Sequence, residues 1–118
     1  MMIPIPPFIK DVSNLRAAAP SLVFVGVEWC GYCKQAKPIM DDVARALGTP
    51  VPVYYIDADA HKLLAKSLNV QSYPAIFYVT DAGVYKFDGE RNVNNLVGFV
   101  CEHSTGSSAH SFCTGPPK

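Results

Sequence analysis

Two cysteines separated by two residues lie where an apolar, strand-like stretch gives way to a helical one. The segment is Trp29–Lys34 (WCGYCK), with the apolar run 22–25 before it and a helical pattern after it as far as Leu47. Cysteines at this spacing can close a small disulfide ring at the start of a helix. There the free backbone N–H groups and the positive end of the helix dipole stabilise a thiolate on the first cysteine. The segment therefore predicts a strand–turn–helix unit with a reactive sulfur at the turn, since the thiolate is the form that attacks disulfides.

The overall composition narrows the class of protein. The chain has 118 residues, and its 10 basic and 10 acidic side chains cancel. This length favours one domain, and zero net charge argues against a nucleic acid or a membrane surface as an electrostatic partner. The apolar N-terminus is short, broken by prolines and without a charged leading region, so we do not interpret it as a signal peptide. We expect a cytoplasmic protein in a reducing environment.

The hydrophobic pattern predicts alternating helices and strands. Expected helices cover 7–19, 33–47, 61–68 and about 92–103, and expected strands cover 21–27, 51–56, 75–80 and 84–87. Strand–helix–strand order implies a parallel crossover, and a turn at 81–83 adds an antiparallel hairpin. The prediction is an α/β protein with a mixed central sheet between helices. The expected domain is 1–103, with its core at 21–103, and the Ser-, Gly- and Pro-rich stretch 104–118 is expected to be a flexible tail.

Over about 21–103 the chain resembles the thioredoxin-like superfamily, and it is similar to thioredoxin or to a single catalytic domain of a protein disulfide isomerase. The likeness rests on motifs in the right order: the Trp29–Lys34 segment, Pro38 in the following helix, Ile56-Asp57, Val70–Pro74, Gly83 and Gly89. The resemblance implies the three-layer thioredoxin fold.

The resemblance also implies roles for the two cysteines. Cys30 is the expected nucleophile, with a pKa below that of a free thiol, and Cys33 is the more buried thiol that resolves the mixed disulfide. Trp29 is expected to pack beside the sulfur pair and to shield one side of it. The alternatives are a static disulfide or half of a zinc site, although no second CxxC completes the usual zinc pair.

Pro74 is the second expected anchor of the site. In the resembling family this proline is cis and faces the two cysteines, and the residue before it, here Tyr73, offers backbone hydrogen bonds to an extended client. Gly31 and Tyr32 stand between the cysteines, where thioredoxins have Gly-Pro and disulfide isomerases Gly-His. The direction of the redox reaction stays open.

Two positions depart from the family pattern. Phe24 stands where the family has a buried Asp or Glu, and Val53 stands where thioredoxins have a lysine. The family acid is thought to carry protons for the second cysteine, which neither apolar side chain can do. Proton transfer to Cys33 is then expected to use water, with Glu28 at the rim as an alternative.

The remaining cysteines need a separate account. Cys101 falls on the apolar stripe of the last expected helix, as a small core residue, and Cys113 is expected to be a free, exposed thiol in the tail. A metal site made of Cys101, His103, His110 and Cys113 is the alternative, although its spacing fits no standard zinc finger.

The predicted function is a thiol–disulfide oxidoreductase that cycles Cys30 and Cys33 between dithiol and disulfide. It needs no bound cofactor. Expected partners are client protein disulfides, with a reductase or glutathione as the electron partner, and neither nucleic acid nor membrane. The alternative, modestly favoured by Phe24 and Val53, is a non-catalytic module that binds a protein or senses redox state.

Overall fold

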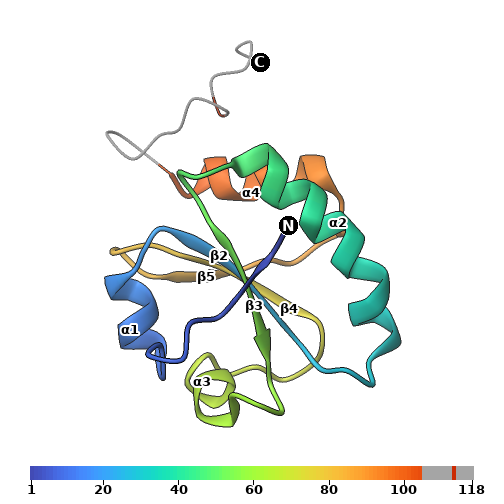
Figure 1. Ribbon diagram of the computed structural model, residues 1–118. Coiled ribbons are helices and arrows are strands. Elements are labelled where there is room, and N and C mark those ends of the chain that lie inside the picture. Colours follow the sequence, from blue (N-terminus) through green and yellow to red (C-terminus); the bar gives the residue numbers. More distant parts are fainter. Residues whose placement is uncertain (105–112, 114–118) are drawn as a thin grey trace.

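The computed structural model describes residues 1–104 and residue 113. Strands and helices largely alternate along the chain (Figure 1). In chain order they are β1 (Ile3–Pro4), α1 (Val12–Ala17), β2 (Ser21–Gly26), α2 (Gly31–Leu47), β3 (Val53–Asp57), α3 (Lys62–Ser67), β4 (Ala75–Val79), β5 (Val84–Lys86) and α4 (Val93–Glu102).

The strands form one mixed sheet in the order β1-β3-β2-β4-β5. The pairs β1/β3 and β3/β2 are parallel, whereas β4 and β5 are antiparallel to their neighbours. Helices α2 and α4 lie together on one face of the sheet, and α1 and α3 lie on the other (Figure 1). The three-layer α/β architecture predicted from the sequence is confirmed.

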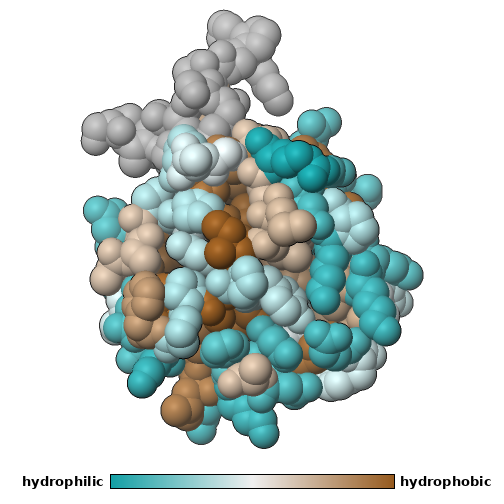
Figure 2. Space-filling model, in the orientation of Figure 1, coloured by the Kyte–Doolittle hydropathy of each residue, from teal (hydrophilic) through white to brown (hydrophobic). Residues whose placement is uncertain are grey.

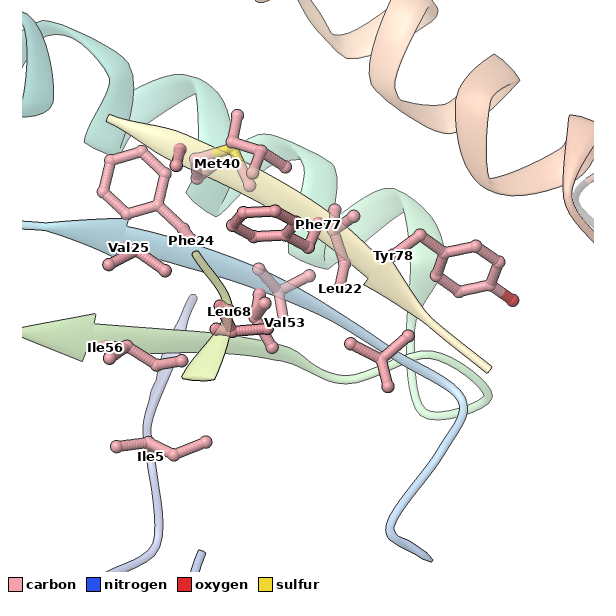
Figure 3. Packing of buried hydrophobic residues seen from close by; sticks show 14 of the residues in the cluster. Ile5, Leu22, Phe24, Val25, Met40, Val53, Ile56, Leu68, Phe77 and Tyr78 are labelled. Carbon is pink, nitrogen blue, oxygen red and sulfur yellow. The ribbon is translucent and has the colours of Figure 1, made fainter. Parts of the chain in front are cut away.

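The central strand β2 is buried over its whole length, as expected for a strand covered on both faces. Phe24 extends from it toward α2, whereas Val25 extends toward the opposite face (Figure 3). Both side chains are fully buried. Because β2 is packed on both faces, the loop that follows its carboxyl end starts from a fixed position.

The N-terminal region differs from the prediction. The helix expected over 7–19 is only Val12–Ala17, and Asp11 caps it by accepting the backbone N–H of Asn14. The residues before it include β1, which pairs in parallel with β3 and was not predicted. A strand of two residues, of which one is a proline and which two further prolines follow closely, has no readable period, and only its pairing partner defines it.

Helix α2 begins at Gly31, two residues before the expected start, and Pro38 lies inside it without ending it. No helix within residues 1–104 combines the length and the apolar character needed to cross a membrane. On the face shown in Figure 2, hydrophilic residues predominate along α2, and hydrophobic ones reach the surface in small separate areas.

The expectations for Cys101 and Cys113 are wrong, because the two form a disulfide with a Cα–Cα distance of 5.5 Å. Cys113 is therefore not a free thiol, and Cys101 is half-buried at the end of α4 instead of a reduced core residue. The bond also removes both thiolates from the alternative metal site with His103 and His110, and His110 itself lies outside the described residues.

The boundary of the folded domain lies slightly beyond 103. Ser104, which the composition assigns to the tail, is buried, and its hydroxyl lies 2.7 Å from the Tyr78 hydroxyl and donates to the Val100 carbonyl. The flexible tail predicted for 104–118 otherwise falls on residues outside the described range, apart from Cys113.

Candidate active site

Cys30 is the residue that caps the N-terminus of α2. It follows the loop from the end of β2, and its Sγ accepts the backbone N–H of Cys33 at 3.1 Å. This is the position at which a polar side chain usually satisfies a free N–H group of the first helical turn. Both cysteines are free thiols, and Cys30 is 8% exposed whereas Cys33 is fully buried. The more accessible sulfur is therefore the one at the helix tip.

The two thiols differ in acidity. Burial favours the neutral thiol of Cys30, but the hydrogen bonds from Cys33 and from the backbone N–H groups at 32 and 33, together with the charge of Arg91, lower its pKa below that of an ordinary cysteine. Burial, and then the hydrogen bond with Cys30, raises the pKa of Cys33 to about 11. The pair therefore combines one thiol that ionises readily with one that holds its proton.

Gly26, the last residue of β2, leaves room for the second sulfur. A Cβ atom at this position would lie 3.1 Å from the Sγ of Cys33 and 3.2 Å from Cε1 of Phe24. Only a residue without a side chain allows strand and helix to approach so closely at this point. The glycine therefore decides how near Cys33 lies to the buried ring of Phe24.

Trp29 lies beside the motif on the surface and is 71% exposed. Its ring meets that of Tyr73 edge-on with centroids 6.1 Å apart, and its indole N–H donates to the Asp59 carboxylate at 3.1 Å. These contacts fix the indole against the loop after β3 and the loop before β4. Trp29 is thus an anchored, exposed aromatic surface next to Cys30.

Pro74 follows a cis peptide bond, as the resemblance predicts. A second cis bond, between Ala19 and Pro20, was not predicted. Strand β4 starts directly after Pro74, and its first residue, Ala75, pairs with Val25 near the end of β2. This pairing brings Tyr73 and Pro74 to the edge of the sheet from which the chain leads into Cys30.

The surface around the cysteines is hollowed on two sides. One hollow runs along Tyr32, which is 65% exposed, and the other along Pro74. Gly89 and Arg91 line both hollows. Gly31 has nothing within 4 Å of the position of a Cβ atom. Two of the predicted site residues, Tyr32 and Pro74, therefore each line a hollow that Gly89 and Arg91 share.

The sheet register shows what lies beside the apolar residue at position 24. Phe24 pairs with Tyr55 across β2 and β3, and Val53 pairs with Leu22. The Tyr55 ring packs against that of Phe24, with ring centroids 5.9 Å apart. Glu28, the alternative proton carrier, is exposed.

Sequence reasoning also missed Arg91 and Lys37, whose charges act on the two sulfurs. The spacing of Lys37, four residues after Cys33, was a usable signal, because such residues share one helix face. Arg91 gave no local signal. In the described part of the chain, no cluster of three or more His, Cys, Asp or Glu side chains could hold a metal ion.

The fold and the dithiol at the tip of α2 define a class of protein, the thioredoxin-like α/β domains with a CxxC pair. The family model for thioredoxin matches residues 7–102, and the chain belongs to the thioredoxin family.

Known relatives agree with this assignment. The chain is 32% identical over 117 residues to a protein disulfide-isomerase, erp38, of Neurospora crassa, covering 95% of this chain and 31% of the relative. It is 31% identical over 94 residues to bloodstream-specific protein 2 of Trypanosoma brucei brucei, covering 78% of this chain and 19% of the relative. The chain thus spans a third or less of these two relatives.

Among solved structures, the first thioredoxin domain of mouse protein disulfide-isomerase A4 is 27% identical with a TM-score of 0.70, over 91% of this chain and 82% of that one. The J-Trx1 fragment of ERdj5 has a TM-score of 0.75 at 19% identity, over 86% of this chain and 51% of that one, and supports the fold alone. The cysteine pair and the disulfide-isomerase relatives together support a family of thiol–disulfide oxidoreductases.

Proposed function

We propose that this protein is a thiol–disulfide oxidoreductase in which Cys30 is the nucleophile and Cys33 the resolving thiol. The observation that carries the proposal is the position of the Cys30 sulfur at the tip of α2, where it accepts the Cys33 N–H and its pKa is lowered. A thiolate there attacks one sulfur of a client disulfide, and the other client sulfur leaves as a thiolate and takes up a proton.

The second step closes the cycle. Cys33 gives up its proton to solvent and attacks the Cys30 sulfur of the mixed disulfide. The bond between Cys30 and the client breaks, the Cys30–Cys33 disulfide forms, and the client sulfur leaves with the electron pair and is protonated. The client is reduced by two electrons and the protein is oxidised by two, and the reverse sequence oxidises a client.

The proposed client is a protein segment in extended conformation. The hollows along Tyr32 and along Pro74, together with the exposed ring of Trp29, offer surface for such a segment near Cys30. A reductase or glutathione is the proposed electron partner. The cytoplasmic location expected from the sequence stays a prediction; the Cys101–Cys113 disulfide favours an oxidising compartment.

Reduction of insulin by dithiothreitol tests the proposed function. The protein is expected to accelerate the reaction well above the dithiothreitol background, and Cys30→Ser is expected to abolish the acceleration. Cys33→Ser is expected to accumulate mixed disulfides with clients, because the resolving thiol is missing. A wild-type rate equal to the background would refute the enzyme and favour the binding module.

The reduction potential of the Cys30–Cys33 pair decides the direction of the reaction. A value near about −270 mV indicates a reductant, and one near about −180 mV an oxidant or isomerase. Equilibration with glutathione buffers of known potential, followed by alkylation and mass spectrometry, measures it.

A further inference from the structure

Lys37 lies over an aromatic ring beneath the active site. Its Nζ is 4.7 Å from the ring centroid of Tyr55 on β3. The Tyr55 ring in turn packs against Phe24, with ring centroids 5.9 Å apart, and its hydroxyl is buried without a hydrogen-bond partner among the described residues. A lysine in this position gains a cation–π attraction, so the ring favours the ammonium group at this position.

Lys37 also lies on the same face of α2 as the resolving thiol. Lys37 follows Cys33 by four residues in α2, so the two side chains share one helix face. The Sγ of Cys33 lies against the Gly26 backbone and near the Phe24 ring that also touches Tyr55. One small region therefore contains the buried sulfur, two aromatic rings and one cation.

The electrostatics connect the same groups. The positive charge of Lys37 favours the thiolate of Cys33, against the burial that raises the pKa of this thiol. Burial, and then the negative charges of Asp57, Glu28, Cys33 and Asp59, raises the pKa of Tyr55 to about 12. Tyr55 therefore stays neutral at physiological pH and offers Lys37 a ring face but no negative charge.

We propose that Lys37, held on the ring of Tyr55, is a positioning residue that stabilises the Cys33 thiolate in the resolving step. The inference rests on the proposed function, because only an oxidoreductase needs this thiolate. When the Cys33 proton leaves for solvent, negative charge develops on a fully buried sulfur beside the apolar Phe24. A cation already fixed nearby lowers the cost of that charge. The bonds made and broken are those of the second step above.

A chromogenic aromatic disulfide separates the two steps in a stopped-flow experiment. The first, bimolecular phase releases one aromatic thiol as Cys30 forms the mixed disulfide. The second, unimolecular phase releases the other as Cys33 attacks. Lys37→Met is expected to slow only the second phase, by about threefold near pH 7. Loss of the Lys37 charge raises the pKa of Cys33 and so reduces its thiolate population, and the higher nucleophilicity of the more basic thiolate offsets about half of that loss on a logarithmic scale. The pH midpoint of the second phase is expected to rise.

Matched variants test whether the position of the charge matters. Lys34→Met removes an exposed lysine next to Cys33 in sequence and is expected to leave the second phase unchanged. Lys37→Arg is expected to restore it, since it keeps the cation. Tyr55→Phe, which keeps the ring, is expected to behave as wild type, whereas Tyr55→Leu is expected to resemble Lys37→Met.

The outcomes distinguish this proposal from the proposed function. An unchanged second phase in Lys37→Met, or an equal slowing in Lys34→Met, would overturn the role of Lys37 while leaving the oxidoreductase intact. A wild-type protein without a second phase would overturn both, because Cys33 would then not resolve the mixed disulfide at all.

Discussion

The cysteines at the tip of α2 are free thiols, whereas the cysteine at the end of α4 is in a disulfide. At the tip of α2, Cys30 and Cys33 are free thiols three residues apart, surrounded by N–H donors and cations. At the end of α4, Cys101 is bonded to Cys113, 12 residues further along the chain. A helix N-terminus favours a negative sulfur, whereas the carbonyl groups at a helix C-terminus oppose it. The same residue type is thus placed for reactivity at one end and for cross-linking at the other.

The two cysteine pairs also differ in how far apart their residues lie along the chain. The Cys30–Cys33 unit is complete within one helical turn. The Cys101–Cys113 bond instead joins the end of α4 to a residue 12 positions further along the chain. The predictions below test this division between a reactive pair and a structural one.

The largest expected effect is the difference in reactivity between the two free thiols. Because the pKa of Cys30 is lowered and that of Cys33 is raised to about 11, only about one Cys33 in a thousand is a thiolate at pH 8, and Cys30 is expected to be ionised far more often. Iodoacetamide alkylation of Cys33→Ser and Cys30→Ser, read by mass spectrometry, measures the two thiols separately. Acidification protonates the thiolate, so the Cys30 rate is expected to fall as the pH drops through its lowered pKa.

A Cys30 rate no greater than that of a cysteine in a short unstructured peptide would contradict the contrast between the two ends. Alkylation of the same variants in denaturant is the control, because there both thiols are expected to react alike.

The structural pair is expected to affect stability and not activity. Cys113→Ser is expected to lower the free energy of unfolding by up to about 3 kcal/mol, the chain-entropy value for a loop of this length. Denaturant titration measures the loss. Insulin reduction by this variant is expected to match that of wild type, and a loss of turnover in the folded variant would show that the two ends are coupled.

Gly26→Ala is expected to destabilise the protein by about 2 kcal/mol, because the new methyl group would press on Cys33 and Phe24 inside a packed core. Denaturant titration measures the change, and the alkylation rate of Cys33 is expected to change with it as the sulfur moves. Gly31→Ala is the control, since a Cβ atom there meets nothing within 4 Å. Equal stability of the two variants would rule out a tight contact between β2 and α2.

The smallest expected effect is that of Tyr55→Phe. The change removes a buried hydroxyl without a hydrogen-bond partner and keeps the ring, so the free energy of unfolding is expected to stay the same or rise by up to about 1 kcal/mol. Thermal and denaturant unfolding measure it. A clear loss of stability would reveal a partner for this hydroxyl, such as a bound water.

Much of the fold was predictable because its signals are local. The continuous apolar run of β2 and the apolar stripes of α2 and α4 indicated their positions to within a few residues. Strand β1 was not predictable, since two residues beside prolines carry no period and are a strand only through pairing with β3.

The residues of the site show the same difference between local signals and tertiary contacts. Cys30, Cys33 and the cis bond before Pro74 followed from motifs and a family likeness. The residue that pairs with Phe24 across the sheet, Tyr55, did not, because strand register is a tertiary property.

The sequence by itself determined the reactive turn. The spacing places Cys33 one helical turn inside Cys30, and short-range hydrogen bonds from Tyr32 and Cys33 lower the pKa of Cys30. Only the tertiary structure decided which groups surround the inner sulfur and which cysteines pair at the far end. Those contacts join Tyr55 to Phe24 and Cys101 to Cys113 across separate elements. Their geometry depends on how strands register and helices pack, which no local pattern of residues encodes.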